Sequence, residues 1–306
     1  MNAASASLIN STIVRSESRW ALIRAYFAVV SRLLPNVARR QAERLFTAPP
    51  RYAGRKPIDG EGPCERVPSG AHSLAVWQSG APGARAVLLV HGWGGRGAQM
   101  RSFVGPLVAN GYRVVWFDQP GHGDSGDGAV ALPDFVRALH SLSTAHGPFT
   151  AAIGHSLGAA ALGVALRGGL PLGRVVFVSS PSSISEHARK FAWMLGITPA
   201  IREAMRRRLE RRYGMPFAEI DRIDELARLR LPALFVHDSD DTDVPLENSL
   251  RLAARMPSSR LIRTYGLGHH RILRDRAVVD AITAFIDGDV ALPAELPVLP
   301  RPAPLF

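Results

Sequence analysis

The sequence predicts an α/β fold in which a mainly parallel sheet is flanked by helices. Residues 85–90 form a nearly continuous apolar run, which is typical of a strand buried on both faces of a parallel sheet. Residues 149–154 form a second apolar run, which leads directly into a helical stretch of small residues at 159–166. The shorter apolar runs that we expect to continue the sheet are 174–179, 233–236 and 260–265.

The chain is long enough to bury one sizeable core. Its 306 residues are 46% hydrophobic, which favours a single domain with additions over two independent domains. About fifty residues separate the strands at 174–179 and 233–236, far more than one loop uses, so we expect a helical insertion at about 181–230. The other parts that we expect are an N-terminal helical extension at 1–60, a main domain at 61–288 and a proline-rich tail at 289–306, either disordered or draped over the surface.

The turn between the strand at 149–154 and the following helix has the sequence Gly154-His155-Ser156-Leu157-Gly158. A sharp strand-to-helix turn strains the backbone of its central serine, and side chains on the flanking positions would collide across the turn. The two glycines remove that bulk. The pattern is that of a nucleophile elbow and indicates Ser156 as a nucleophile.

The strand at 85–90 ends in a glycine-rich loop, His91-Gly92-Trp93-Gly94-Gly95. A loop of this kind is either a tight turn alone or a means of aiming a backbone N–H outward. Together with the elbow it favours an oxyanion hole, in which the backbone N–H groups of Trp93 and Leu157 hold the developing negative charge.

A base and an acid to orient it are expected downstream of the serine. The strand at 233–236 runs into a loop with four aspartates, and the strand at 260–265 is followed by two adjacent histidines, His269 and His270. A histidine on this loop would act as general base, and one of the aspartates would orient it. The four aspartates are Asp238, Asp240, Asp241 and Asp243.

With these motifs, the chain resembles the α/β-hydrolase family over roughly residues 70–287. The matching segments are 90–95, 118–125, 154–158, the aspartate loop and 268–269. In relatives the acid stands three residues before a Val-Pro pair, which selects Asp241, and the base follows a glycine, which selects His269. The resemblance keeps Asp238, Asp240, Asp243 and His270 as alternatives, and it implies a bracing role for Asp118.

The resemblance implies a serine hydrolase that cleaves carboxylic esters of small molecules through an acyl-enzyme. Dehalogenases and epoxide hydrolases of similar fold carry an aspartate in the elbow, so Ser156 favours acyl chemistry. No cofactor and no metal are expected. Short-to-medium acyl chains are the favoured substrates. The alternatives are a thioesterase, a carrier-linked acyl esterase or lipase, and a catalytically silent hydrolase-like binding protein.

The insertion is expected to contain two helices, at 183–195 and 199–213, and hydrolases of this family carry a lid here. The first helix holds an apolar cluster that either lines a substrate pocket or packs in a core: Phe191, Trp193, Met194 and Leu195. The second is rich in arginine and has either a solvated face or a docking surface for an acidic acyl carrier. Its arginines are Arg202, Arg206, Arg207, Arg208, Arg211 and Arg212.

Residues 20–34 predict a helix with a narrow polar stripe that contains Arg24, Ser31 and Arg32. The rest of its surface is broad and apolar, so we expect it to be buried, preferably over the hydrolase core or its pocket. An interfacial helix on an anionic membrane surface is the alternative. Its two arginines and short length argue against a membrane span, and no early basic region or cleavage pattern suggests a secretory signal.

The net charge of +11 comes almost wholly from arginine, with Lys56 and Lys190 as the two lysines. The arginines are scattered and no nucleic-acid-binding motif accompanies them, so we expect no nucleic-acid partner. Cys64 is the single cysteine, which excludes an internal disulfide. We expect a cytoplasmic protein, with a peripheral position at the membrane as the alternative.

Overall fold

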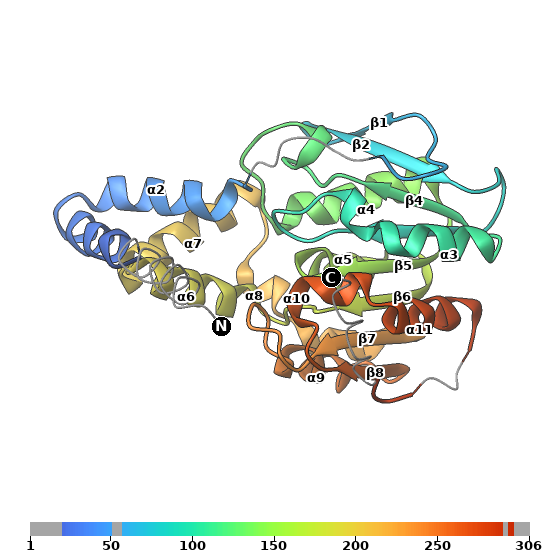
Figure 1. Cartoon of the computed structure of the whole chain (residues 1–306). Coiled ribbons are helices and arrows are strands. Elements are labelled where there is room, and N and C mark those ends of the chain that lie inside the picture. Colours follow the sequence, from blue (N-terminus) through green and yellow to red (C-terminus); the bar gives the residue numbers. More distant parts are fainter. Residues whose placement is uncertain (1–19, 51–56, 290–292, 297–306) are drawn as a thin grey trace, which may run out of the picture. The chain divides into compact units, whose positions relative to one another are not determined.

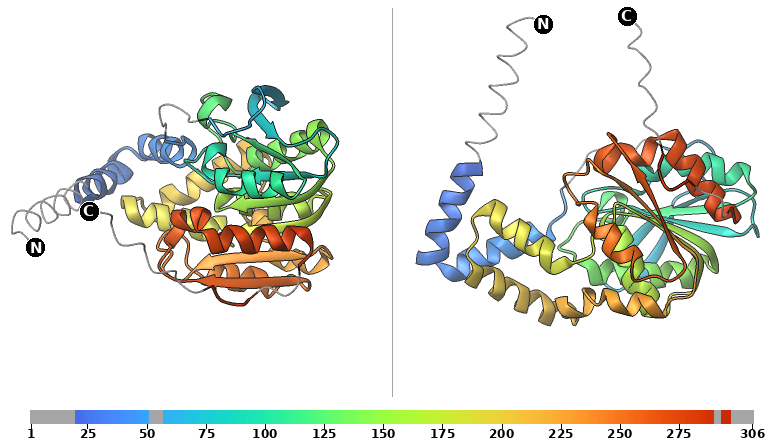
Figure 2. Two further views of the ribbon diagram at one scale, coloured as in Figure 1. Left: turned by 45° about the vertical axis from the view of Figure 1, so that its right-hand side comes forward. Right: turned by 90° about the horizontal axis from the view of Figure 1, so that it is seen from below.

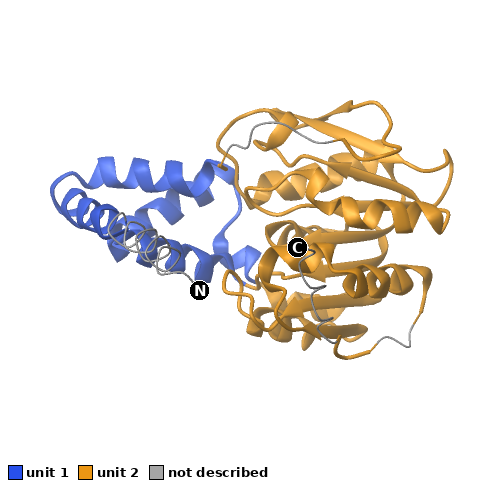
Figure 3. Cartoon of the chain, in the orientation of Figure 1, with its two compact units in different colours: residues 1–48, 183–221 blue, residues 49–182, 222–306 orange. Residues whose placement is uncertain are grey.

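The structure is a computed structural model that describes residues 20–50, 57–289 and 293–296. The chain divides into two compact units (Figure 3). Unit 1 comprises residues 1–48 and 183–221, and unit 2 comprises residues 49–182 and 222–306. Parts of the predicted N-terminal extension and of the predicted tail, including residues 1–19 and 297–306, lie outside the described residues.

Unit 2 is built on a sheet that has eight strands within the described residues, in the order β1-β2-β4-β3-β5-β6-β7-β8 (Figure 1). The strands from β4 to β8 in this order pair in parallel, whereas β1 and β2 are antiparallel at one edge. The mainly parallel α/β class is therefore confirmed. The strands are β1 (Glu65–Ser69), β2 (His72–Ser79), β3 (Ala86–Val90), β4 (Arg113–Phe117), β5 (Phe149–His155), β6 (Leu172–Val178), β7 (Ala233–Asp238) and β8 (Ser259–Thr264).

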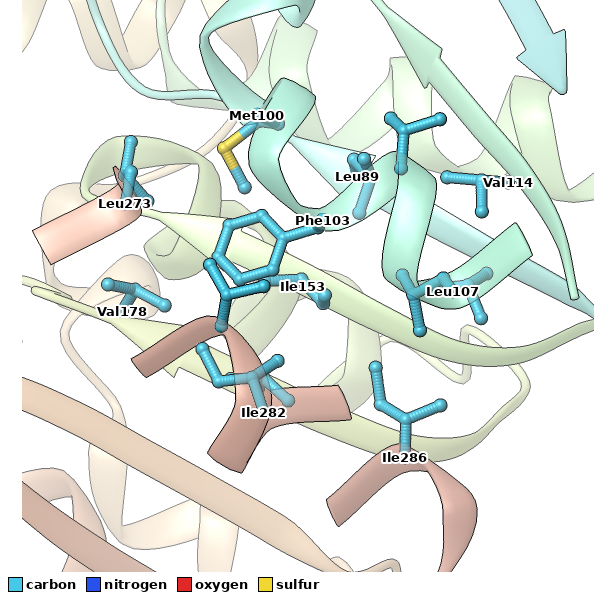
Figure 4. Packing of buried hydrophobic residues seen from close by; sticks show 14 of the residues in the cluster. Leu89, Met100, Phe103, Leu107, Val114, Ile153, Val178, Leu273, Ile282 and Ile286 are labelled. Atoms are coloured by element: carbon cyan, nitrogen blue, oxygen red, sulfur yellow. The ribbon is translucent and has the colours of Figure 1, made fainter. Parts of the chain in front are cut away.

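Helices cover both faces of this sheet, because adjacent residues of one central strand face different helices. Ile153 of β5 belongs to the core beneath α3 and α11, where Phe103 and Ile282 also pack (Figure 4). The next residue, Gly154, faces α5, whose Leu162 lies on that side. The helices of unit 2 are η1 (Gly97–Phe103), α3 (Val104–Ala109), η2 (Gly123–Ser125), α4 (Leu132–His146), α5 (Leu157–Arg167), η3 (Ile223–Arg228), α9 (Glu247–Ala253), α10 (Gly268–Arg271), η4 (Ile272–Arg274) and α11 (Arg276–Asp287).

The parallel arrangement brings the carboxyl ends of β3, β5, β7 and β8 to one edge of the sheet. Figure 2 shows this sheet in two further views, with the red helix α11 packed against it. Strand β3 is buried along its whole length, which fits a strand covered by helices on both faces. The loops that leave these four strands carry the serine, the aspartates and the histidines of the sequence motifs. They form the candidate site.

Unit 1 consists of helices within the described residues. Its elements are a helix at 20–33, α2 (Pro35–Thr47), α6 (Ile184–Leu195), α7 (Pro199–Tyr213) and α8 (Phe217–Ile220). The helices that we expect at 183–195 and 199–213 are α6 and α7. The Ser183 hydroxyl accepts a hydrogen bond from the Glu186 N–H at 3.1 Å and so caps α6. The left-handed Gly196 and Gly214 end the two helices.

The helix at 20–33 differs from the expectation, because its apolar face is exposed. Phe27 and Ser31 turn inward and are 3% and 8% exposed, whereas Leu22 and Leu33 are 71% and 73% exposed. The expected burial of the broad apolar face is therefore wrong. Of the polar stripe, Ser31 turns inward while Arg24 and Arg32 are exposed, and Arg24 Nε donates to the Met194 carbonyl of unit 1 at 3.1 Å.

The described part of the tail pairs with the sheet. The Arg263 N–H of β8 donates to the Ala294 carbonyl at 2.9 Å, and the Leu296 N–H donates to the Arg263 carbonyl at 3.0 Å. Residues 294–296 therefore run along the edge of β8. Residues 290–292 and 297–306 lie outside the described part of the chain.

In the ranges that the structure describes, we find no helix with the length and apolarity needed to cross a membrane.

Candidate active site

Ser156 occupies a strained turn between β5 and α5. Its φ of 52° and ψ of −124° are rare for a residue with a side chain. A Cβ atom on Gly154 would lie 2.7 Å from the Ala159 Cα, and one on Gly158 would lie 2.4 Å from the His91 carbonyl oxygen. Positions 154 and 158 must therefore be glycine for α5 to start directly against the sheet.

Three side chains that lie far apart in the sequence form one hydrogen-bonded chain. His269 Nε2 is 3.0 Å from Ser156 Oγ, and His269 Nδ1 is 2.7 Å from Asp241 Oδ2. The Asp241 side chain is fully buried and that of His269 is 9% exposed. The structure thus brings together the three residues that the resemblance selects.

Asp241 is held as an ionised acceptor. Burial on its own would raise the pKa of its carboxyl, but hydrogen bonds from His237, His269 and the Val244 N–H outweigh burial and hold this pKa far below its usual range. The N–H groups of Asp243 and Val244 both donate to Asp241 Oδ1 at 2.9 Å. A carboxylate only accepts, so His269 carries its proton on Nδ1, and the Ser156 hydroxyl donates to the unprotonated Nε2.

The other three aspartates of the loop have different partners. Asp238 accepts from the Thr264 hydroxyl at 2.7 Å and from the Leu267 N–H at 3.0 Å, so it braces the loop that carries His269. Asp240 accepts from the Gly266 N–H at 2.8 Å. Asp243 lies 3.8 Å from His270, and both of these side chains are exposed. Asp241 and His269 therefore form the hydrogen-bonded chain with Ser156, whereas Asp238, Asp240, Asp243 and His270 have other partners.

The loop after β3 runs directly against Ser156. A Cβ atom on Gly92 would lie 2.9 Å from the Ser156 Cβ, so glycine is needed at this approach. His91 is fully buried, donates from Nδ1 to the Gly92 carbonyl at 2.7 Å and accepts from the Gln119 N–H at 2.8 Å. Burial lowers the pKa of His91 to about 4 and keeps the ring neutral, as these two bonds require.

A second neutral histidine supports the same loop. His122 Nδ1 donates to the Pro120 carbonyl at 2.8 Å, and its Nε2 accepts from the Gly94 N–H at 3.1 Å. Burial lowers the pKa of His122 to about 3. The Trp93 ring packs edge-on against His122 at 5.3 Å, so the backbone on both sides of Trp93 is fixed.

His155, the residue before Ser156, contacts His269. Its Nε2 donates to the carbonyl oxygen of His269 at 2.9 Å, and the two ring centroids are 4.7 Å apart. The residue is 3% exposed, and burial followed by the proximity of His269 lowers its pKa to about 3. A neutral ring here adds no positive charge beside His269.

His237 supports the loop on which Asp241 lies. Its Nε2 is 2.8 Å from the Val244 carbonyl and 3.5 Å from Asp241 Oδ2, and its Nδ1 is 2.7 Å from the Ser249 hydroxyl. A carbonyl only accepts, so Nε2 carries the proton and the Ser249 hydroxyl donates to Nδ1. This fully buried ring ties the end of β7 to the start of α9.

Asp118 braces the loop that follows β4. Its Oδ1 accepts from the Gly97 N–H at 2.7 Å and its Oδ2 from the Asp124 N–H at 2.8 Å. A Cβ atom on Gly123 would collide with this carboxylate, and the φ of Gly123 is +47°. The segment that the resemblance marks as a brace therefore holds η1 and η2 against the sheet.

The apolar cluster predicted to bind substrate lies on α6 in unit 1. Phe191 packs edge-on against Phe46 of α2 at 5.1 Å, and Leu195 is 8% exposed. Trp193 is 71% exposed and has the Arg24 guanidinium 5.0 Å from its ring, while the Met194 carbonyl accepts from Arg24. A role of these four residues in substrate binding stays a prediction.

The supporting histidines are the part of the site that the motifs do not identify. The signal for them in the sequence is their position beside the glycines and the candidate triad residues of the motifs. These histidines are His91, His122, His155 and His237. Their partners are backbone carbonyls and N–H groups, which a sequence pattern does not name.

The model of the alpha/beta hydrolase family matches residues 87–281 of this chain. Two curated relatives are each a pimeloyl-[acyl-carrier protein] methyl ester esterase. The one from Photobacterium profundum is 34% identical over 135 residues, 44% of this chain and 50% of that protein. The one from Sodalis glossinidius is 36% identical over 83 residues, 27% of this chain and 31% of that protein. The chain thus spans half or less of the length of these relatives.

Solved structures with the same fold include esterases and serine hydrolases. The Pyrococcus furiosus esterase Pf2001 has a TM-score of 0.62 at 18% identity, covering 78% of this chain and 98% of its own. The serine hydrolase CCSP0084 from Cycloclasticus zankles has a TM-score of 0.59 at 18% identity, covering 75% of this chain and 99% of its own. At sequence identities this low, the similarity to these structures establishes the fold alone.

Proposed function

Because the chain belongs to the alpha/beta hydrolase family, we propose that it is a serine hydrolase that cleaves carboxylic esters through an acyl-enzyme intermediate. The observation that carries this proposal is the continuous chain from Ser156 Oγ through His269 to Asp241, with distances of 3.0 Å and 2.7 Å. A binding protein of this fold has no need for all three groups in this order.

In the first half of the reaction, Ser156 Oγ attacks the ester carbonyl carbon while its proton passes to His269 Nε2. The imidazolium that forms keeps its Nδ1–H bond to the ionised Asp241, which stabilises the new positive charge. His269 then returns the proton to the leaving alkoxide oxygen. The carbon–oxygen bond breaks, an alcohol departs and the acyl group stays on Ser156.

In the second half, His269 takes a proton from a water molecule, whose oxygen attacks the acyl carbon. The second tetrahedral intermediate collapses and releases the carboxylic acid, and the proton on Nε2 returns to Ser156 Oγ. The free enzyme is restored, and the balance is one ester and one water consumed for one alcohol and one acid.

We assign the oxyanion hole to the backbone N–H groups of Trp93 and Leu157. Leu157 is the first residue of α5 and directly follows Ser156, so its N–H belongs to the positive end of that helix. The tight approach of Gly92 to Ser156 supports Trp93, because it holds the preceding backbone against the nucleophile. Two such donors would stabilise the charge that forms only during the reaction.

The favoured substrates are esters of short-to-medium acyl chains. The proposal is tested by turnover of a p-nitrophenyl ester series from acetate to palmitate, with Ser156→Ala as the matched variant. An optimum at short or medium chains that disappears in Ser156→Ala supports the proposal. An optimum at palmitate indicates a lipase, faster turnover of matched thioesters indicates a thioesterase, and no turnover of any ester by folded protein supports the binding protein.

A carrier-linked acyl ester is a second candidate, favoured by the names of the curated relatives and by the charge of α7. Arg206 pairs with Glu203 and Glu210. Arg207 lies 3.8 Å from Glu203 and Arg208 lies 3.1 Å from Glu43, yet their side chains are still 59% and 54% exposed. Exposed guanidinium groups on one helix would attract the acidic surface of a carrier protein.

This candidate predicts a selective effect of charge reversal. Arg207→Glu combined with Arg211→Glu would raise KM for a carrier-linked ester and leave KM for a p-nitrophenyl ester unchanged. Arg276→Glu on α11, whose side chain is 89% exposed, is the matched control. Equal KM values for the carrier-linked ester in the α7 variant and the wild type would dismiss the carrier.

A further inference from the structure

The helix at 20–33 carries an exposed apolar stripe formed by Leu22, Tyr26, Val29 and Leu33. The spacing of four, three and four residues places these side chains on one face. They are 71%, 45%, 54% and 73% exposed, respectively. Scattered exposed apolar residues are ordinary on a protein surface, but an ordered stripe of this length marks an interaction site.

The apolar stripe is on the outward side of this helix, whereas Phe27 is 3% exposed on its inward side. Ser31 is 8% exposed and its hydroxyl has no hydrogen-bond partner among the described residues, whereas the four apolar side chains of the stripe point outward. A helix that merely covered a protein would turn the stripe inward and Ser31 outward. The arrangement suits an apolar medium outside the protein.

Aromatic and cationic groups accompany the stripe. Tyr26 lies in it and donates its hydroxyl to Gln41 at 2.7 Å. Trp193 is 71% exposed, with the exposed Arg24 above its ring at 5.0 Å, and Arg32 is exposed one residue before the end of the stripe. Aromatic rings beside arginines are typical of helices that lie in the headgroup region of a bilayer.

The positive charge of the chain is concentrated in unit 1. Its 87 residues, 1–48 and 183–221, hold 15 arginines and lysines against 7 aspartates and glutamates, a net charge of +8. Unit 2 holds 22 basic and 19 acidic residues, a net charge of +3. Most of the excess charge of the protein therefore belongs to the unit that carries the stripe.

We propose that the stripe docks on an anionic lipid surface, with the helix at 20–33 lying in the plane of the headgroups. The apolar side chains would enter the boundary between headgroups and acyl chains, while the basic residues of unit 1 would be attracted to lipid phosphates. Charge also selects this occupant over a second copy of the chain, since pairing stripe against stripe would bring two units of +8 together.

The test is flotation of the full-length protein with vesicles of phosphatidylcholine with or without phosphatidylglycerol. We expect binding that requires phosphatidylglycerol and weakens with added salt. The variant Leu22→Ser/Val29→Ser/Leu33→Ser should bind more than about tenfold less tightly, because apolar burial is a main part of the affinity. Leu250→Ser on α9, where the leucine is 46% exposed, is the matched control and should bind like the wild type.

A second measurement reports the insertion itself. Cys64 is exposed and is the only cysteine, so Cys64→Ser followed by Val29→Cys places an environment-sensitive NBD dye on the stripe. Its fluorescence should increase and shift to the blue with anionic vesicles, whereas the dye on Leu250→Cys should not respond.

Three results would overturn the proposal: no vesicle binding by the wild type, binding by the triple variant equal to that of the wild type, or a dimer in sedimentation that the triple variant loses while lipids have no effect. Turnover of a soluble p-nitrophenyl ester by the same samples separates this proposal from the proposed function. The stripe residues are not among the proposed catalytic residues, so the triple variant should turn over the soluble ester as fast as the wild type.

Discussion

His155 Nε2 lies 2.9 Å from the carbonyl oxygen of His269 and donates a hydrogen bond to it. The Ser156 segment and His269 are therefore linked twice. One link joins Ser156 Oγ to His269 Nε2, and the other joins the His155 side chain to the His269 backbone. The second link fixes the position of the His269 backbone, while the hydrogen bond to Asp241 fixes the rotation of the His269 ring.

We expect His155 to act as a positioning residue for His269. His155→Leu removes the donor, and we expect kcat to fall by about 10- to 100-fold with little change in KM, because a small displacement of the base affects the reaction more than binding. His155→Gln, whose amide N–H can reach the same carbonyl, should recover most of the loss. Equal kcat values in the leucine and glutamine variants would show that the hydrogen bond has no such role.

Asp241→Asn should lower kcat by roughly 10⁴-fold, as expected when the acid of a serine triad can no longer hold the productive tautomer of the base. The asparagine can donate to His269 Nδ1 and so favours the proton on Nε2, where the Ser156 hydroxyl needs an acceptor. Asp243→Asn is the control, since Asp243 lies near His270 on the surface. Steady-state kinetics measure kcat for both variants. A larger fall in kcat for Asp243→Asn than for Asp241→Asn would reverse the assignment of Asp241 as the acid.

Two glycine-to-alanine substitutions on α5 test whether the turn after Ser156 requires glycine. Gly158→Ala places a Cβ atom 2.4 Å from the His91 carbonyl oxygen, so it should lower the free energy of unfolding by about 1–3 kcal/mol. Gly163→Ala, in the same helix, meets its nearest atom at 3.9 Å and should be neutral or stabilise the protein by up to about 1 kcal/mol. Urea denaturation of both variants measures this difference, and similar effects of the two substitutions would contradict the packing of α5.

The buried histidines predict how stability depends on pH. Burial lowers the pKa of His91 to about 4 and those of His122 and His155 to about 3, from 6.5. The unfolded chain therefore binds more protons than the fold below pH about 6.5. Stability should be fully present above this pH and decline as the pH falls toward 3, with each histidine adding a slope of about 1.4 kcal/mol per pH unit.

His122→Gln tests one of these contributions. The side-chain oxygen of the glutamine can still accept from the Gly94 N–H, but glutamine does not titrate. Denaturant unfolding between pH 7 and pH 4 should show a slope reduced by about 1.4 kcal/mol per pH unit relative to the wild type. An unchanged slope would mean that His122 takes up a proton in the folded protein.

The sheet and the elbow are predictable because their causes are local. A continuous apolar run such as β3 fits burial on both faces, and the glycines around Ser156 are required by atoms a few residues away or in the adjacent loop. Strand β1 lacks such a signal, since Glu65–Ser69 alternates in burial and contains a proline. Helix α2 buries Ala38 and Ala42 rather than large apolar residues, so no apolar stripe marks it in the sequence.

The rest of the site depends on contacts between distant residues. His155 and His269 are 114 positions apart, and no pattern in either motif indicates that one donates to the backbone of the other. The helix at 20–33 shows the same limit. Its amphipathic pattern is clear from the sequence, but the pattern does not tell which apolar side chains turn outward, and the structure exposes Leu22 and Leu33 while it buries Phe27.

The most direct test of the account is labelling by a fluorophosphonate, read by intact mass and compared between the wild type and Ser156→Ala. The account predicts one adduct on the wild type and none on Ser156→Ala, with the same circular dichroism and thermal unfolding for both proteins. A well-folded wild type that takes up no label, or a Ser156→Ala variant that is labelled like the wild type, would contradict an activated Ser156.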